Sequence, residues 1–190
     1  MEEPNPHEKF HRSAADLEAG LDHIRQSPAG GGRLEMVLRR PQTEEREVLE
    51  AAELTTEVGV VGDNWIERSS TRTEDGSAHP DMQLNLMNVR VAELVAGPRE
   101  RWPLAGDQLY VDLDLQDSAL PHWTKLAIGD AVIQITDQPH NGCAKFRRRF
   151  GAEALKFVNS PVGKELHLRG VNARVLEAGT IRPGDEIRFL

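Results

Sequence analysis

Residues 127–151 read AIGDAVIQITDQPHNGCAKFRRRFG, and the spacing of their apolar side chains changes halfway along the segment. Over 127–136, apolar and small side chains surround the dipeptide Gly129-Asp130, which predicts two strands joined by a tight turn. After Cys143 the apolar side chains recur at helical spacing. The segment therefore predicts a pair of strands that leads into a helix, with Cys143 at the junction.

Short strands are also predicted on both sides of this segment. The dipeptide Gly-Asp occurs four times, and we expect a turn at each because glycine allows positive φ and aspartate bonds nearby backbone amides. Alternating apolar residues predict strands over 33–40, 110–115, 171–175 and 186–190, and a strand that runs into a short helix over 84–95. Short strands divided by turns indicate a mainly β protein with added helices, built as a small antiparallel barrel or sandwich.

Helices are predicted around this β framework. Helical spacing indicates helices over 14–26, over 44–54, directly after Cys143, and over 152–158. The first of these begins after Ser13, which is a favourable N-cap. The first dozen residues resemble a mobile tail. We therefore expect residues 1–40 to form an N-terminal tail and helix extension, and residues 41–190 to form one compact barrel domain.

The composition limits the class of protein. The chain has 190 residues, with 31 acidic and 23 basic side chains, a net charge of −8 and a single cysteine. This length suffices for one domain with its own core, and one cysteine excludes an internal disulfide and any four-cysteine zinc site. The acidic total argues against non-specific nucleic-acid binding. The lack of a long apolar run or a signal-like start predicts a cytoplasmic protein that does not bind membranes.

The charge is distributed unevenly, and the cysteine lies in the most basic segment. Residues 139–150 contain Lys145 and Arg147–Arg149 without any acid. Amides at a helix start and neighbouring cations favour a thiolate, and a thiolate at Cys143 could carry a persulfide sulfur, attack an electrophile or bind a soft metal. The alternatives are that the cysteine is a small buried hydrophobe and that the arginines are a solvated helix face.

His140, three residues before Cys143, is a candidate partner for the thiol. It could accept the thiol proton as a base or, as a cation, hold an anionic substrate. A His/Cys pair alone is a weak indication of a metal, since catalytic zinc needs three protein ligands. Further ligands would have to come from His79, His122 or His167, so we do not expect a closed zinc site. The acidic face of one predicted strand is expected to be solvated and consists of Asp112, Asp114 and Asp117.

Several further motifs accompany the cysteine segment. PHNGCAKFRRRFG at 139–151 is followed by FVNSP at 157–161, by Gly170 and by GTIRPGD at 179–185, and it is preceded by LAGDQL at 104–109 and LAIGD at 126–130. Together these motifs resemble the MOSC domain, which is named for the C-terminal part of molybdenum cofactor sulfurases. The resemblance covers about 88–190 well and 49–87 loosely, and it does not extend to the first 40 residues.

The resemblance implies a MOSC-like antiparallel β-barrel in which Cys143 carries sulfur, or is a metal ligand if molybdenum is bound. For the sulfurases it implies a domain that binds molybdenum cofactor and receives sulfur from a separate pyridoxal-phosphate desulfurase domain. Related reductases hold molybdenum cofactor with this cysteine as metal ligand and reduce N-hydroxylated compounds.

The chain departs from these relatives in several respects. It is too short for a pyridoxal-phosphate domain beside the barrel, so pyridoxal phosphate is not expected on this chain. The His-Gly-Gly type motif that many stand-alone relatives carry before the cysteine segment is absent, as is the extra N-terminal β domain of the larger reductases. His122 and Trp123 stand where smaller residues are expected.

The sequence thus predicts a sulfur carrier or a molybdenum-cofactor-binding protein that uses Cys143. The alternatives are a molybdenum-dependent reductase of N-hydroxylated compounds and a non-catalytic binding module. A cysteine desulfurase or a molybdenum enzyme is the expected partner. The candidate catalytic residues are Cys143 and His140, and the candidates for holding the anionic part of a cofactor are Lys145, Arg147, Arg148, Arg149, Asn88 and Arg90.

Overall fold

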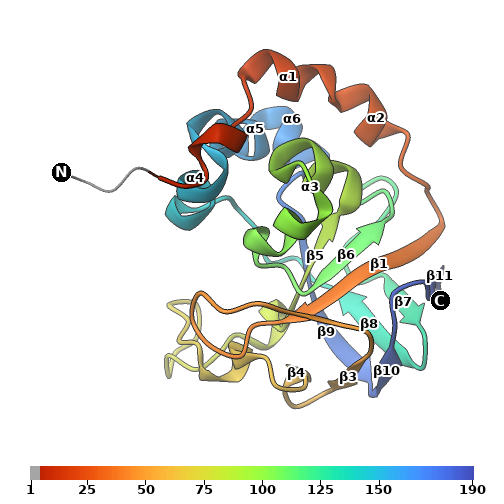
Figure 1. Ribbon diagram of the computed structural model, residues 1–190. Helices are drawn as coiled ribbons and strands as arrows, with labels where there is room; N and C mark the ends of the chain where they lie inside the picture. Colours follow the sequence, from red (N-terminus) through yellow and green to blue (C-terminus); the bar gives the residue numbers. More distant parts are fainter. Residues whose placement is uncertain (1–4) are drawn as a thin grey trace.

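The computed structural model describes residues 5–190, and within them seven strands close into a barrel (Figure 1). Their order around the barrel is β11-β7-β8-β9-β5-β6-β1, and β1 pairs with β11 to complete the circle. The strands are β1 (Gly31–Arg39), β5 (Leu84–Asn88), β6 (Leu109–Asp112), β7 (Lys125–Ile128), β8 (Ala131–Ile135), β9 (Val171–Glu177) and β11 (Glu186–Phe189). The predicted β-barrel with added helices is confirmed.

One pair of barrel strands, β5 and β6, is parallel, whereas the other barrel pairs are antiparallel. Parallel neighbours need a crossover connection. Here the crossover consists of α3 (Val89–Ala96) and the 3-10 helix η4 (Arg99–Ala105). This crossover places the end of η4 next to the start of β6, where the candidate site lies.

Residues 44–54 do not form the predicted helix. They contribute β2 (Glu47–Leu49), which pairs with β1, and the start of β3 (Ala52–Thr55). β3 joins β4 (Gly59–Val60) and β10 (Gly179–Ile181) in a separate three-stranded sheet. Ala52 and Leu54 are buried on either side of exposed Glu53. Pairing with strands distant in sequence therefore outweighs the helical propensity of this segment.

The helices lie on one side of the barrel, above it in Figure 1, away from β3 and β4. Besides α3 they are α1 (Ala14–Ala19), α2 (Leu21–Arg25), α4 (Ala144–Phe150), α5 (Ala152–Asn159) and α6 (Pro161–Glu165). Short 3-10 helices are η1 (Glu8–Phe10), η2 (Asn64–Glu67) and η3 (Pro80–Met82). The predicted Ser13 cap is present as a capping box with Asp16, and the predicted helix is divided in two at Gly20.

Two apolar cores result from this arrangement. One fills the barrel, and the other lies between the barrel and the helices. β1 serves both, since Leu34 belongs to the barrel core whereas Met36 and Leu38 belong to the helical one. Tyr110 of β6 also faces the helices, and its hydroxyl donates a 2.6 Å hydrogen bond to the Trp102 carbonyl of η4. The helices and the barrel therefore form two packed layers of one domain.

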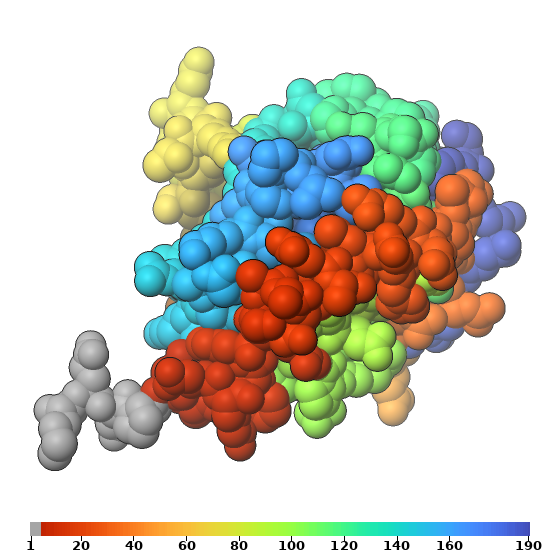
Figure 2. Space-filling model, turned by 90° about the horizontal axis from the view of Figure 1, so that it is seen from above, coloured from red at the N-terminus to blue at the C-terminus, as the bar shows by residue number. Residues whose placement is uncertain are grey.

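The expected boundary at residue 40 does not separate an extension from the barrel. β1 lies within residues 1–40, yet it pairs with β11, β6 and β2. In place of a mobile tail, residues 5–12 contact α4 and η4: the Asn5 side chain donates to the Arg148 carbonyl at 2.8 Å, and the Arg101 guanidinium lies 3.8 Å from the centre of the Phe10 ring. Figure 2 shows this red segment beside the cyan and blue helices. Residues 1–4 of the expected tail lie outside the described residues.

Among residues 5–190, no helix combines the length and the apolar character needed to cross a membrane.

Candidate functional site

A cleft of about 580 Å³ lies between the barrel and α4. Its walls come from the loop after β1, the end of η2, the end of η4, the loop before α4 together with α4 itself, and Arg169, which lies two residues before β9. Two acidic side chains, Glu44 and Glu67, line it, against six basic ones: Arg40, Arg46, Arg68, Lys145, Arg149 and Arg169. In an acidic chain, this cleft is a concentrated site of positive charge.

Cys143 is the N-cap of α4 and lines the cleft with an exposed thiol. The Asn159 side chain holds the preceding residue in place, because it accepts a 2.9 Å hydrogen bond from the Gly142 amide and donates one of 3.2 Å to the Gly142 carbonyl. A Cβ at Gly142 would lie 2.8 Å from Leu155 and 2.9 Å from Val158. Glycine thus lets the cysteine loop approach α5 closely. The predicted position of Cys143 at a helix start is confirmed.

The inner wall of the cleft contains a buried ionic group around Asp107. The Arg169 guanidinium donates to both carboxylate oxygens, at 2.7 and 2.9 Å. It also donates to the Ala105 carbonyl at 3.0 Å. Its Nε is buried and has no hydrogen-bond partner among the described residues. His140 completes the group, with 2.8 Å between its Nε2 and the Asp107 Oδ1.

This environment keeps the His140 ring neutral. Burial lowers the pKa of His140 and the charge of Arg169 lowers it further, while Asp107 acts in the opposite direction. Burial raises the pKa of Asp107, but Arg169 and His140 outweigh that effect, so the carboxyl stays ionised. An ionised carboxylate only accepts hydrogen bonds, so the His140 Nε2 carries the proton and Nδ1 has a free lone pair.

Arg40 is held by a second buried carboxylate. Its guanidinium contacts Asp63 at 2.8 and 2.9 Å, and it also donates to the Gly106 carbonyl at 3.0 Å. Asp63 and Asp107 each follow a glycine with positive φ, at Gly62 and Gly106. The predicted Gly-Asp turns are confirmed, since the other two glycines, Gly129 and Gly184, also have positive φ. Two of the four turns additionally supply the carboxylates that position arginines in the cleft.

Glu44 neutralises part of the positive charge of the basic side chains on α4. It forms ion pairs with Lys145 at 3.2 Å, with Arg148 at 3.3 Å and with the buried Arg149. The hydrogen bond from Arg149 lowers the pKa of Glu44 to about 2, burial acts in the opposite direction, and Lys145 contributes to the lowering. Glu44 has a φ of +68°, which is unusual for a residue other than glycine. The chain therefore places a carboxylate of its own among these cations.

Two of the basic residues remain available to a ligand. Arg46 donates to the Pro103 carbonyl and Arg68 to the Asn64 side chain, and neither pairs with a carboxylate in the part of the chain that the structure describes. Desolvation lowers the pKa of Arg68 to about 10, with the charge of Arg40 adding to the effect. Arg68 still remains charged at neutral pH. A second hollow, of about 220 Å³, adjoins the cleft beside Arg68 and adds the ring of Trp65.

The structure brings together only some of the predicted site residues. Cys143, His140, Lys145 and Arg149 line the cleft, whereas Arg147 and Arg148 do not. Asn88 and Arg90 also lie outside its lining. Asn88 instead caps α3 and donates to Ser27 and to the Leu113 carbonyl, and Arg90 pairs with Asp112 at 3.1 Å. The roles of these two side chains in the structure are capping and ion pairing.

Sequence reasoning missed four arginines of the cleft, which are Arg40, Arg46, Arg68 and Arg169. They lie far apart along the chain and carry no local motif of their own. The signal available in the sequence for Arg40 and Arg169 was the pair of Gly-Asp dipeptides that contain Asp63 and Asp107, because a buried aspartate requires a cationic partner. Cys143 is not part of any group of three metal-ligating side chains among the described residues.

The comparisons with known proteins agree with this architecture. The family model of the MOSC domain matches residues 87–188. The sequence matches none of the curated proteins. The fold is similar to that of the YuaD protein from Bacillus subtilis, with a TM-score of 0.63 and 14% identity over 83% of this chain and 94% of that one. YiiM from Escherichia coli gives a TM-score of 0.53 and 17% identity, over 83% of this chain and 69% of that chain. At these identities the likeness is one of fold.

Proposed function

We propose that the basic cleft of this chain, which belongs to the MOSC domain family, binds molybdenum cofactor and that Cys143 is the sulfur group that acts on it. The family is associated with molybdenum cofactor binding. The observation that carries this proposal is that the single cysteine of the chain opens into the same cleft as six basic side chains. A thiol alone would be weak evidence. A thiol beside a cluster of basic side chains can act on an anionic ligand that those side chains hold.

The donor set of the cleft fits an anionic cofactor that carries a phosphate. Arg46 and Arg68 have no carboxylate partner among the described residues, and guanidinium groups bind phosphate oxygens in a bidentate manner. The Nε of Arg169 is a buried donor without a hydrogen bond in the described part of the chain. The adjoining hollow beside Trp65 offers an apolar surface for an organic ring.

When bound, the cofactor supplies a metal centre that exchanges electrons and oxygen with a substrate. Cys143 would hold that centre through its thiolate, and Arg46 and Arg68 would hold the phosphate. Asn159 keeps the Cys143 loop against α5, which fixes the position of the sulfur. His140 offers the lone pair of its Nδ1 as a proton acceptor, because Asp107 fixes the proton on Nε2.

The same site supports sulfur transfer as the second use of Cys143. The thiolate takes one sulfur atom from the persulfide of a donor, so that a persulfide forms on Cys143 and the donor is left as a thiolate. A cysteine desulfurase is the class of partner that supplies such a sulfur, and a molybdenum enzyme is the class that receives it. The exposure of the Cys143 thiol supports access by a partner protein.

The test is to purify the protein from a host that makes molybdenum cofactor and to measure molybdenum and pterin per chain. We expect near-stoichiometric amounts for the wild type and for the control Arg25→Ala, which removes an exposed arginine on α2. In a double Arg46→Ala, Arg68→Ala variant, the amounts of molybdenum and of pterin per chain should each fall at least about tenfold. Cys143→Ser should keep pterin and lose molybdenum if Cys143 is the metal ligand. A mass of the intact protein that shows one added sulfur on Cys143, without bound molybdenum, supports the sulfur-carrier function instead. A wild type that retains neither pterin nor added sulfur contradicts both.

A further inference from the structure

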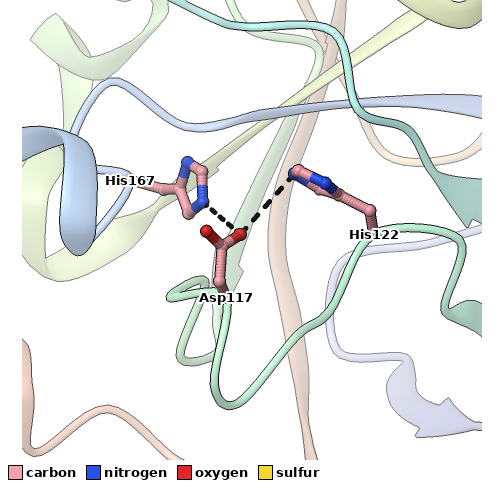
Figure 3. A group of neighbouring side chains, drawn as sticks. All are labelled: Asp117, His122 and His167. Carbon is pink, nitrogen blue, oxygen red and sulfur yellow. Dashed lines mark hydrogen bonds and ion pairs between the residues drawn. The ribbon is translucent and has the colours of Figure 1, made fainter.

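Asp117, His122 and His167 form a cluster outside the cleft (Figure 3). Asp117 and His122 belong to the loop that connects β6 to β7, and His167 follows α6. The Asp117 Oδ1 lies 2.8 Å from the Nε2 of His167 and 3.5 Å from the Nε2 of His122. One ligand atom from each of the three residues lies within 4.8 Å of the others. The two rings thus present their Nε2 atoms toward one carboxylate.

The backbone holds the two histidines in position. Trp123, next to His122, donates its amide to the Ile135 carbonyl of β8 at 2.9 Å and accepts a 3.0 Å hydrogen bond from Gln134. His167 has a φ of +47° directly after the C-cap of α6, where glycine is the usual residue. The next residues close the turn, since the Gly170 amide donates to the His167 carbonyl at 2.7 Å. The convergence of the rings is therefore set by the end of β8 and by the end of α6.

Two imidazoles and one carboxylate on two loops are a ligand set for a divalent transition metal. Zinc takes imidazole nitrogen at about 2.0–2.1 Å and carboxylate oxygen at about 2.0–2.2 Å in tetrahedral geometry, which places neighbouring ligand atoms about 3.3 Å apart. The distance from Asp117 to His122 is close to this value, and that to His167 is shorter. The Asp117 side chain is 65% exposed, so it is free to move by the few tenths of an ångström that an ion requires.

We propose that Asp117, His122 and His167 bind one Zn²⁺ ion, with water at the remaining coordination position. The ion would connect the β6–β7 loop to the end of α6, across 50 residues of sequence between Asp117 and His167. The ion would hold these two segments together, because its ligands come from both of them. The cluster shares no residue with the lining of the cleft. The proposal does not depend on molybdenum cofactor or on Cys143.

Zinc binding is tested by calorimetric titration of metal-free protein with Zn²⁺. We expect one ion per chain and a rise in Tm of about 5–10 °C at a hundredfold excess of Zn²⁺ over its Kd. His122→Ala and His167→Asn should each weaken binding at least about tenfold. Asparagine is chosen at position 167 because it tolerates positive φ. The matched control His23→Ala removes an exposed histidine of α2 and should bind zinc as the wild type does.

Tryptophan fluorescence gives a second readout that reports the place of binding. Trp123 adjoins His122 and is 46% exposed, whereas Trp65 and Trp102 are each 7% exposed. Ni²⁺, bound in place of Zn²⁺, should quench the emission of the wild type and quench Trp123→Phe much less. Zinc binding that survives both histidine substitutions, or that is lost only in Cys143→Ser, overturns the proposal. Absence of stoichiometric binding by the wild type also overturns it.

Discussion

The ring of His140 lies against the fully buried carboxylate of Asp107, with 2.8 Å between Nε2 and Oδ1. His140 comes from the cysteine segment and Asp107 from a Gly-Asp turn 33 residues earlier. Arg169 donates hydrogen bonds to both oxygens of the same carboxylate. Through Asp107, three distant parts of the chain meet at the inner wall of the cleft.

His140 should remain neutral at a pH where an exposed histidine is half protonated. Burial and Arg169 lower its pKa below 6.5. Because the folded-state value is the lower one, the unfolded chain binds more protons as the pH falls below about 6.5, so this residue reduces stability in acid and not above neutrality. Nuclear magnetic resonance of the ring nitrogens checks this. Titration of His140 at or above 6.5 would contradict it.

Asp107→Asn should destabilise the protein strongly, because the buried Arg169 would lose its counter-ion. Removing one partner of a buried pair costs about 3–5 kcal/mol. The control Asp22→Asn removes a carboxylate that is 90% exposed and pairs with Arg25, so it should change the free energy of unfolding by less than about 0.5 kcal/mol. Urea denaturation measures both. Equal effects of the two substitutions would show that Asp107 has no such role.

Glu44→Gln should lower stability near neutral pH by about 1 kcal/mol or less, since the Glu44 side chain is 43% exposed and solvent screens its ion pairs. The folded-state pKa of about 2 lies below the ordinary glutamate value of 4.5. The contribution of Glu44 is therefore complete above about 4.5 and is lost as the pH falls toward 2. The free energies of unfolding of wild type and variant, measured by urea titration across this range, should converge in acid. A constant difference would contradict the assignment.

Gly142→Ala should displace the loop that carries Cys143. The new Cβ would lie within 3.0 Å of Leu155 and Val158, and such overpacking costs about 1–3 kcal/mol. Gly31→Ala is the control, because its Cβ would meet one atom only, the Ile187 carbonyl oxygen at 3.3 Å. The test compares the Tm values and, in protein from a cofactor-producing host, the molybdenum content. An unchanged Tm and molybdenum content in Gly142→Ala would show that the close approach is unimportant.

Cys143 should react stoichiometrically with iodoacetamide in the native protein, because its thiol is exposed. Cys143→Ser should change the free energy of unfolding by less than about 0.5 kcal/mol, as is usual for surface substitutions. Mass spectrometry of the labelled chain checks the first result and urea denaturation the second. Labelling that occurs only on unfolding would support the alternative of a packing cysteine in a binding module.

Much of the fold was predictable from local patterns. The strand pair around Gly129-Asp130, the helix that starts at Cys143 and the Ser13 cap follow from spacing and turn chemistry, which act over a few residues. Residues 44–54 could not be predicted this way. Their conformation depends on pairing with β1 and β10, and neither partner is visible in the segment itself.

By itself the sequence determined a framework of short strands divided by turns, the basic surroundings of Cys143 and the chemistry open to a thiol at that place. The tertiary structure alone decided which cations share a space with the sulfur. Arg40 and Arg169 lie more than a hundred residues apart and enter one cleft, whereas Arg148, adjacent to the cleft-lining Arg149 on α4, does not line it. The physical reason is that helical and strand periodicities describe which side of an element is buried, but closure of the barrel determines which buried sides meet.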